Sequence, residues 1–173
     1  RDHCVTGVQT CALPISTSSC GLEVDVSGFD YFVGELRCSA CGAVSKSDTS
    51  TNIQTKVSIH PKLCILGVGD KVEAEWGSIH LAGYLRIRPP LVHNSVTLLE
   101  TWECPSCDRP FNWARIWIDL SVIHRIEAVE LTDVVVQTAN FITEDCRFLL
   151  PEQTPVDWET IVERLQAFLR SSE

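Results

Sequence analysis

Two Cys-x-x-Cys pairs are the residues of this chain whose type and spacing can do chemistry. The first pair is Cys38 and Cys41, followed by Gly42, and the second is Cys104 and Cys107. A turn of this length directs backbone N–H groups at the sulfurs and lowers the thiol pKa, and four thiolates make the tetrahedral donor set that suits Zn²⁺. Because four cysteines fill every coordination position, we expect the metal to be structural and not catalytic.

Zinc is the first candidate for this site, iron is the second, and disulfides or free thiols are the third. Seven of the nine cysteines lie beyond residue 15, and this odd number favours reduced thiols and a metal over a disulfide framework. Cys64 and Cys146 lie in stretches where we expect a cysteine to act as a buried small hydrophobe. We do not favour a catalytic cysteine, since the sequence places no histidine beside one.

Residues 1–15 are expected to be a library artefact and not natural protein. Residues 5–15 read VTGVQTCALPI, which is the in-frame translation of a common short-read sequencing adapter. Such a segment is excluded from fold reasoning. We expect residues 16–28, which are mostly small and polar, to be a disordered remnant, and the adapter suggests a microbial source from an environmental assembly.

The charge balance is acidic. The 173 residues hold 14 Lys and Arg against 23 Asp and Glu, for a formal net charge of −9. This charge disfavours nucleic acid as a partner unless a local basic stripe forms from Arg86, Arg88, Arg109 and Arg115. No apolar run approaches the length of a membrane span, so a cytoplasmic protein without a membrane segment is the default expectation.

Alternating apolar residues and turn signals predict a β-rich, zinc-containing domain over residues 29–150. The expected strands cover residues 29–36, 53–59, 72–76, 84–87, 96–103, 113–120 and 122–131, of which the last two form a hairpin. Residues 132–141 are compatible with a strand or a helix. A short helix is expected over residues 143–150, opened by a polar cap.

Residues 151–173 are predicted to form an amphipathic helix. Thr154 can cap it, Pro155 suits the first helical position, and one face carries Trp158, Ile161, Val162, Leu165, Phe168 and Leu169. Docking on the sheet is the expected role, and binding of a partner is the alternative. The predicted fold is α+β: a mainly antiparallel β-sheet or partly open barrel, with a Cys4 site at its edge and C-terminal helices.

The two cysteine turns resemble the knuckles of zinc-ribbon and rubredoxin-type proteins. The resemblance covers the Cys38 and Cys104 knuckles with their flanking strands, and it implies a Cys4 metal site with zinc or, as in rubredoxins, iron that transfers electrons. Two features depart from the family pattern. Sixty-two residues separate Cys41 from Cys104, where a compact ribbon has about 15–20, and Asp108 stands where glycine is usual.

Other reactive side chains have simpler expected roles. His60, His80, His93 and His124 share no metal-ligand spacing and are expected to be solvated or hydrogen-bonded. Aromatic residues flank the second knuckle, and we expect them to form a hydrophobic shell around the thiolates, with base stacking as the alternative: Trp102, Phe111, Trp113 and Trp117. Nucleotide-binding and hydrolase motifs are absent from the sequence.

These features favour a small, acidic, non-catalytic binding or interaction protein with a structural zinc and an unknown protein partner. One alternative is an accessory protein of nucleic acids, which requires the basic stripe. The other is an enzyme with a structural zinc. That alternative requires a pocket that gathers at least two residues of one group: His60, His80, His93, His124, Asp70 and Glu75.

Overall fold

A computed structural model describes residues 29–58, 63–76, 81–88, 90, 95–109 and 111–149, together with residues 163 and 167. The expectations for residues 1–28 lie outside this description. The same holds for the helix expected over residues 151–173, apart from Glu163 and Ala167. Both therefore remain predictions from the sequence.

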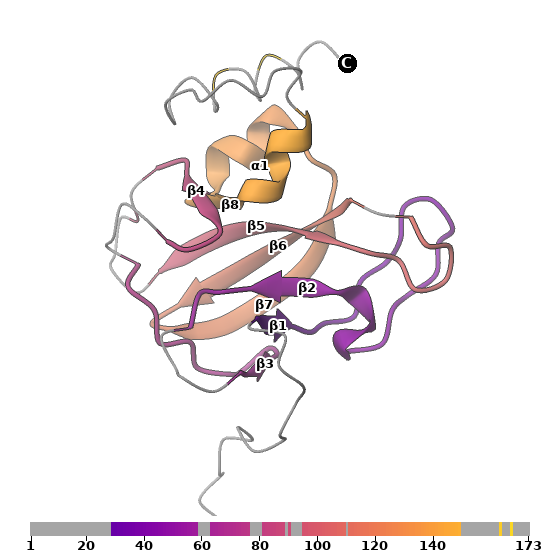
Figure 1. Cartoon of the computed structure of the whole chain (residues 1–173), viewed down its shortest axis with the longest axis horizontal. Helices are drawn as coiled ribbons and strands as arrows, with labels where there is room; N and C mark the ends of the chain where they lie inside the picture. Colours follow the sequence, from indigo (N-terminus) through magenta and orange to yellow (C-terminus); the bar gives the residue numbers. More distant parts are fainter. Residues whose placement is uncertain are drawn as a thin grey trace, which may run out of the picture.

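A small sheet of three short strands forms one layer (Figure 1). Strand β1 (Asp30–Phe32) lies at its centre, antiparallel to β2 (Ile53–Thr55) and parallel to β3 (Ile65–Leu66). The expected strand at residues 53–59 is thus shorter than its alternating pattern indicates.

A five-stranded sheet in the order β4-β8-β5-β6-β7 forms the second layer. Its members are β4 (Tyr84–Arg86), β5 (Val96–Trp102), β6 (Asn112–Asp119), β7 (Val122–Val129) and β8 (Phe141–Thr143). Only β5 and β8 pair in parallel; the other pairs are antiparallel. The predicted β6–β7 hairpin is confirmed, and a register shift after Trp117 adds a bulge to it.

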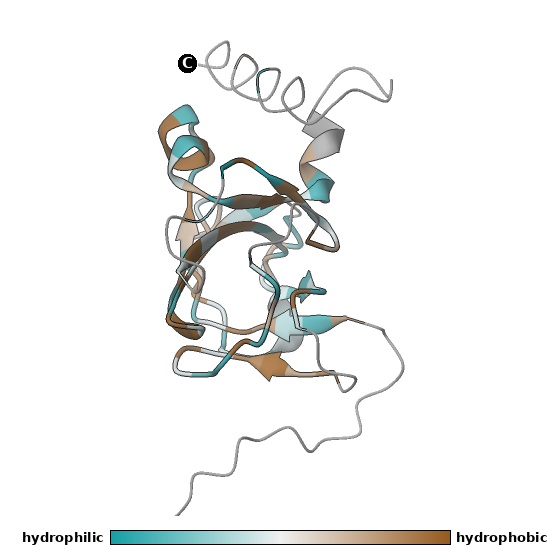
Figure 2. Cartoon of the chain, turned by 90° about the vertical axis from the view of Figure 1, so that its left-hand side faces the viewer, coloured by the Kyte–Doolittle hydropathy of each residue, from teal (hydrophilic) through white to brown (hydrophobic). Residues whose placement is uncertain are grey.

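The hydrophobic core lies on both faces of the large sheet. The main cluster joins residues of the small sheet, such as Phe32 and Ile53, to Leu98 and Ile116 of the large one. A second cluster on the opposite face packs Val136 of helix α1 (Asp133–Thr138) against the sheet. Figure 1 shows α1 beyond β5 and β8, on the side away from β1–β3, and Figure 2 shows apolar stretches on the strands.

The β-rich character predicted from the sequence is confirmed, but two finer expectations need correction. Both sheets are mixed, and the described strands do not close into a barrel. Residues 72–76 were expected to return as a strand, yet they form no strand. The backbone of residues 69–72 hydrogen-bonds instead to residues 121–123 at the β6–β7 turn, while Val72 and Trp76 are buried without strand pairing.

The ambiguous segment 132–141 contains both helix and strand. Thr132 caps α1, because its hydroxyl oxygen accepts a hydrogen bond from the backbone N–H of Val135 at 3.3 Å. The chain then enters β8 and continues into η2 (Glu144–Leu149), a 3₁₀ helix where the short helix was expected. A further 3₁₀ turn, η1 (Thr49–Thr51), precedes β2.

Replacing Glu100 by glutamine is expected to stabilise the fold at neutral pH. Glu100 is buried in β5, where desolvation and the nearby Asp145 carboxylate raise its pKa well above 4.5, against the opposing hydrogen bond from Thr143. The folded state then retains a proton that the unfolded state has lost, so the free energy of unfolding of the natural protein falls as pH rises above the unfolded pKa. The variant removes this decline.

Urea unfolding from about pH 6 to about pH 8 checks this prediction. The difference between Glu100→Gln and the natural protein should grow with pH, in favour of the variant. Glu103→Gln is the matched control, because Glu103 is exposed and follows the same strand. A variant that is less stable than the natural protein at every pH would show that the Glu100 carboxylate is charged and satisfied in the folded state.

Candidate metal centre

The structure brings the four predicted ligands together at one edge of the molecule. Their sulfur atoms all lie within 4.8 Å of one another. The Cys38–Cys107 sulfurs are 3.9 Å apart and the Cys41–Cys104 sulfurs are 3.7 Å apart. Four sulfurs at the usual Zn–S bond length in a tetrahedron are separated by about 3.8 Å. The cluster could therefore hold one metal ion.

The two knuckles have the same backbone hydrogen bonds. In the first, the Gly42 N–H donates to the Cys38 carbonyl at 2.9 Å and the Cys38 N–H donates to the Ala43 carbonyl at 2.8 Å. In the second, the Asp108 N–H donates to the Cys104 carbonyl at 2.9 Å, and the Cys104 N–H donates to the Arg109 carbonyl at 3.1 Å. The cysteines thus occupy equivalent positions in two matching turns.

Gly42 and Asp108 hold the same left-handed backbone position in their knuckles, with φ of 75° and 51°. Only glycine adopts this region without a steric penalty, and aspartate is among the side chains that tolerate it best. The departure from the ribbon pattern at Asp108 is therefore a change of residue without a change of backbone.

Substitutions at these two positions should differ in their effect on the free energy of unfolding. Gly42→Ala should lower the free energy of unfolding by about 1 kcal/mol, while Asp108→Gly should leave it unchanged or raise it slightly. A Cβ on Gly42 meets no atom within 4 Å, so the penalty comes from the backbone alone. Urea denaturation of both variants with metal bound checks the pair, and equal losses in both would contradict it.

Hydrogen bonds between segments far apart in the sequence explain how 62 intervening residues can separate two halves of one site. The first knuckle follows β1 and is closed by Ser45, whose hydroxyl accepts from the Leu36 N–H at 2.9 Å and donates to the Gly34 carbonyl at 3.2 Å. The second lies between β5 and β6. The Glu103 N–H donates to the Thr51 carbonyl at 2.9 Å, which ties the entrance of the second knuckle to the loop before β2.

Asn112 is a positioning residue that the sequence pattern did not reveal. Its buried side-chain amide donates to the carbonyl oxygens of Arg109, at 2.9 Å, and Trp102, at 3.2 Å. These two bonds brace both ends of the second knuckle, and the amide oxygen lies 4.0 Å from the Cys38 sulfur. An asparagine that follows a Cys-x-x-Cys turn by five residues carries no recognisable motif, so only the fold reveals its role.

The thiols of the centre differ in acidity. The backbone N–H of Cys41, assisted by that of Ala40, lowers the pKa of Cys38 to about 6 against the effect of desolvation. At Cys107 the backbone N–H of Arg109 lowers the pKa, but desolvation and the neighbouring sulfurs of Cys104, Cys41 and Cys38 outweigh it and raise the pKa to about 12. Four thiolates so close together require a cation to offset their charge.

The expected aromatic shell is only half present. Trp102 and Trp113 are buried, with the Trp102 indole N–H donating to the Trp113 carbonyl at 3.2 Å. Phe111 is 49% exposed and Trp117 is 46% exposed. Trp117 lies against His124 with ring centroids 5.6 Å apart. It shares a face of β6 with the buried Trp113 but lies on a part of that face that is exposed. The expectation was wrong for Trp117, which is not part of a buried shell.

The remaining candidates do not gather around the cysteines. His60, His80 and His93 lie outside the described residues, and His124 is exposed. The Asp70 carboxylate accepts a hydrogen bond from the Gly67 N–H at 2.7 Å and thereby caps a turn. Cys64 and Cys146 are buried, as predicted, in the two core clusters. Two cavities lie beside the knuckles and another lies beside Trp117 of β6. None of these cavities is lined by His124, Asp70 or Glu75.

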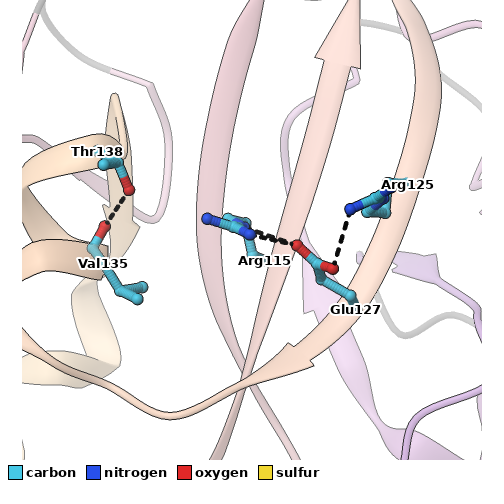
Figure 3. A network of polar contacts seen from close by, with 5 residues as sticks. All are labelled: Arg115, Arg125, Glu127, Val135 and Thr138. Atoms are coloured by element: carbon cyan, nitrogen blue, oxygen red, sulfur yellow. Dashed lines mark hydrogen bonds and ion pairs between the residues drawn. The ribbon is translucent and has the colours of Figure 1, made fainter.

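Three of the four arginines proposed for a basic stripe have separate partners. Arg88 donates to the carbonyl oxygens of Thr138 and Ala139 at the end of α1. Arg115 donates to the Glu127 carboxylate from β6, and Arg125 meets the same carboxylate from within β7 (Figure 3). Arg109 lies elsewhere, beside the cysteines. The described contacts therefore supply no observation in favour of a continuous nucleic-acid surface.

Comparison with protein-family models, with curated proteins and with solved structures finds no significant match to this chain. The fold and the site define a β-rich protein with two mixed sheets and a four-cysteine centre that could bind a metal ion. Among the described residues, no helix has both the length and the apolar character that crossing a membrane requires.

Proposed function

We propose that this chain is a non-catalytic binding protein whose Cys4 centre holds one structural zinc ion. The spacing of the four sulfurs, from two matching knuckles, is the observation that supports the proposal. Its geometry resembles that of zinc-ribbon knuckles. With Cys38, Cys41, Cys104 and Cys107 as ligands, no coordination position remains for water or substrate.

Zinc is favoured over iron and over disulfides by the chemistry of the donors. Thiolate ligands in a tetrahedral arrangement suit zinc, and the metal would join parts of the chain that lie far apart in sequence. The six described cysteines are all free thiols, which supports a reducing compartment such as the cytoplasm. The proposed role of the metal is to hold the two knuckles in one arrangement that a partner protein recognises.

Elemental analysis of protein purified without a metal-binding tag tests the proposal. We expect one zinc per chain, and chelation should remove it together with the cooperative unfolding transition. One iron per chain with a visible absorption band would indicate that the site transfers electrons. A chain without metal would overturn the proposal and leave the four thiols as candidates for redox chemistry.

A further inference from the structure

A cavity lined by described residues adjoins the cysteine centre. Its volume is about 410 Å³, within the range of ligand pockets. Arg37 and Ser39 line it from the first knuckle, and Arg109 and Phe111 line it from the second. Trp113, Ala128, Val129 and Leu131 form its apolar wall, and the Glu130 side chain also lines the pocket. The pocket thus lies where the two knuckles meet the large sheet.

The two arginines of this pocket have no acidic partner among the described residues. Arg37 donates to the Gly42 carbonyl at 2.9 Å, and Arg109 donates to the Ser39 hydroxyl at 3.5 Å, which leaves further guanidinium N–H groups of both without a described hydrogen bond. By contrast, Arg115 and Arg125 share the Glu127 carboxylate (Figure 3). Glu130 also lines the pocket but forms no described ion pair with either arginine, so two cations stand against one carboxylate. In a chain of net charge −9, this local positive balance favours an anionic ligand.

Phe111 adds an apolar contact at the same place. It is 49% exposed, and its φ of 58° lies in the left-handed region, which is unfavourable for a bulky side chain. Such backbone strain is concentrated at ligand-binding sites, where the surrounding structure maintains it. Val44, which pairs with Arg37 across the first knuckle, is also 48% exposed. Exposed apolar residues beside arginines are typical of the centres of protein interfaces.

We infer that this pocket binds a short peptide segment of a partner protein in which an aromatic side chain is flanked by carboxylates. The guanidinium groups of Arg37 and Arg109 receive the carboxylates, and the aromatic side chain packs between Phe111 and the wall at Trp113. Charge complementarity and the apolar wall together select this chemistry. The inference rests on the proposed function, because the metal is what holds the two arginine-bearing knuckles together.

The test uses the full chain with its metal and a fluorescent, N-acetylated peptide that carries one phenylalanine between two glutamates. Fluorescence anisotropy should show saturable binding. Arg37→Gln and Arg109→Gln should each weaken it about tenfold or more, since each removes a charge-assisted hydrogen bond. Arg125→Gln is the matched control and should bind like the natural chain. A peptide with glutamine in place of both glutamates should bind at least about tenfold more weakly.

Three results would overturn the inference. They are no binding at millimolar peptide, binding by the Arg37→Gln and Arg109→Gln variants as tight as that by the natural chain, or binding of phenylacetate as tight as that of the peptide. Metal content is measured for every variant, so that the two proposals fail separately. If the chain contains zinc but does not bind the peptide, the proposed structural zinc stands and the proposed peptide pocket is refuted. A chain that lacks zinc contradicts the proposed function itself.

Discussion

Replacing Cys38 or Cys104 by serine is expected to abolish metal binding and to remove most of the stability of the fold. Each variant loses one of four thiolates, and the free energy of metal binding in such a site is also free energy of folding. We expect a loss of several kcal/mol, which is comparable to the whole stability of a domain of this size. Thermal unfolding followed by circular dichroism, together with metal analysis, measures both effects.

Cys64→Ser and Cys146→Ser are the matched controls for these variants. Both thiols are buried in the core clusters and lie outside the four-cysteine centre. Burying a hydroxyl in their place should cost about 1–3 kcal/mol and leave the metal content unchanged. If Cys38→Ser kept its metal and its melting temperature, the cysteine centre would not be what holds the fold together.

Trp102→Ala is expected to be the most damaging substitution away from the cysteines, with a loss of about 3–5 kcal/mol. The indole is 1% exposed within the main core, and its N–H donates to the Trp113 carbonyl. The Trp102 carbonyl in turn accepts from Asn112, which braces the second knuckle. Collapse of the cavity left by alanine should therefore disturb the metal centre as well, and we expect weaker retention of zinc against a chelator.

Trp117→Ala provides the comparison on the neighbouring strand. Trp117 is 46% exposed and contacts His124, so its removal should cost less than about 1 kcal/mol. Guanidinium denaturation of both variants measures the difference. Similar losses at Trp102 and Trp117 would show that both tryptophans belong to one shell, as the sequence suggested.

The four cysteines and the β6–β7 hairpin could be predicted because their signals are local. The spacing of the cysteines predicts the two Cys-x-x-Cys turns. The alternation of Ala114, Ile116 and Ile118 matches the buried face of β6. Each of these signals depends on residues within one turn or one strand. Long-range pairing only had to bring the two knuckles together.

The features that the sequence did not reveal depend on contacts between distant segments. The sequence pattern of Val72 and Trp76 is that of a strand. Their segment instead hydrogen-bonds to the β6–β7 turn, and both side chains are buried without strand pairing. Asn112 acts through its position beside the second knuckle, and Trp117 is exposed although Trp113, on the same face of β6, is buried. Hydrophobicity and propensity alone specify neither partner nor direction.

The position of β8 has a consequence for the order in which the chain folds. This strand comes after β4 through β7 in the sequence but lies between β4 and β5 in the sheet. A chain emerging from the ribosome therefore presents β5 with an open edge until residues 141–143 arrive to fill the gap. Until then the unpaired edge can recruit strands of other chains. Synthesis beyond β8, and not completion of the hairpin, is the moment at which this edge of β5 is covered.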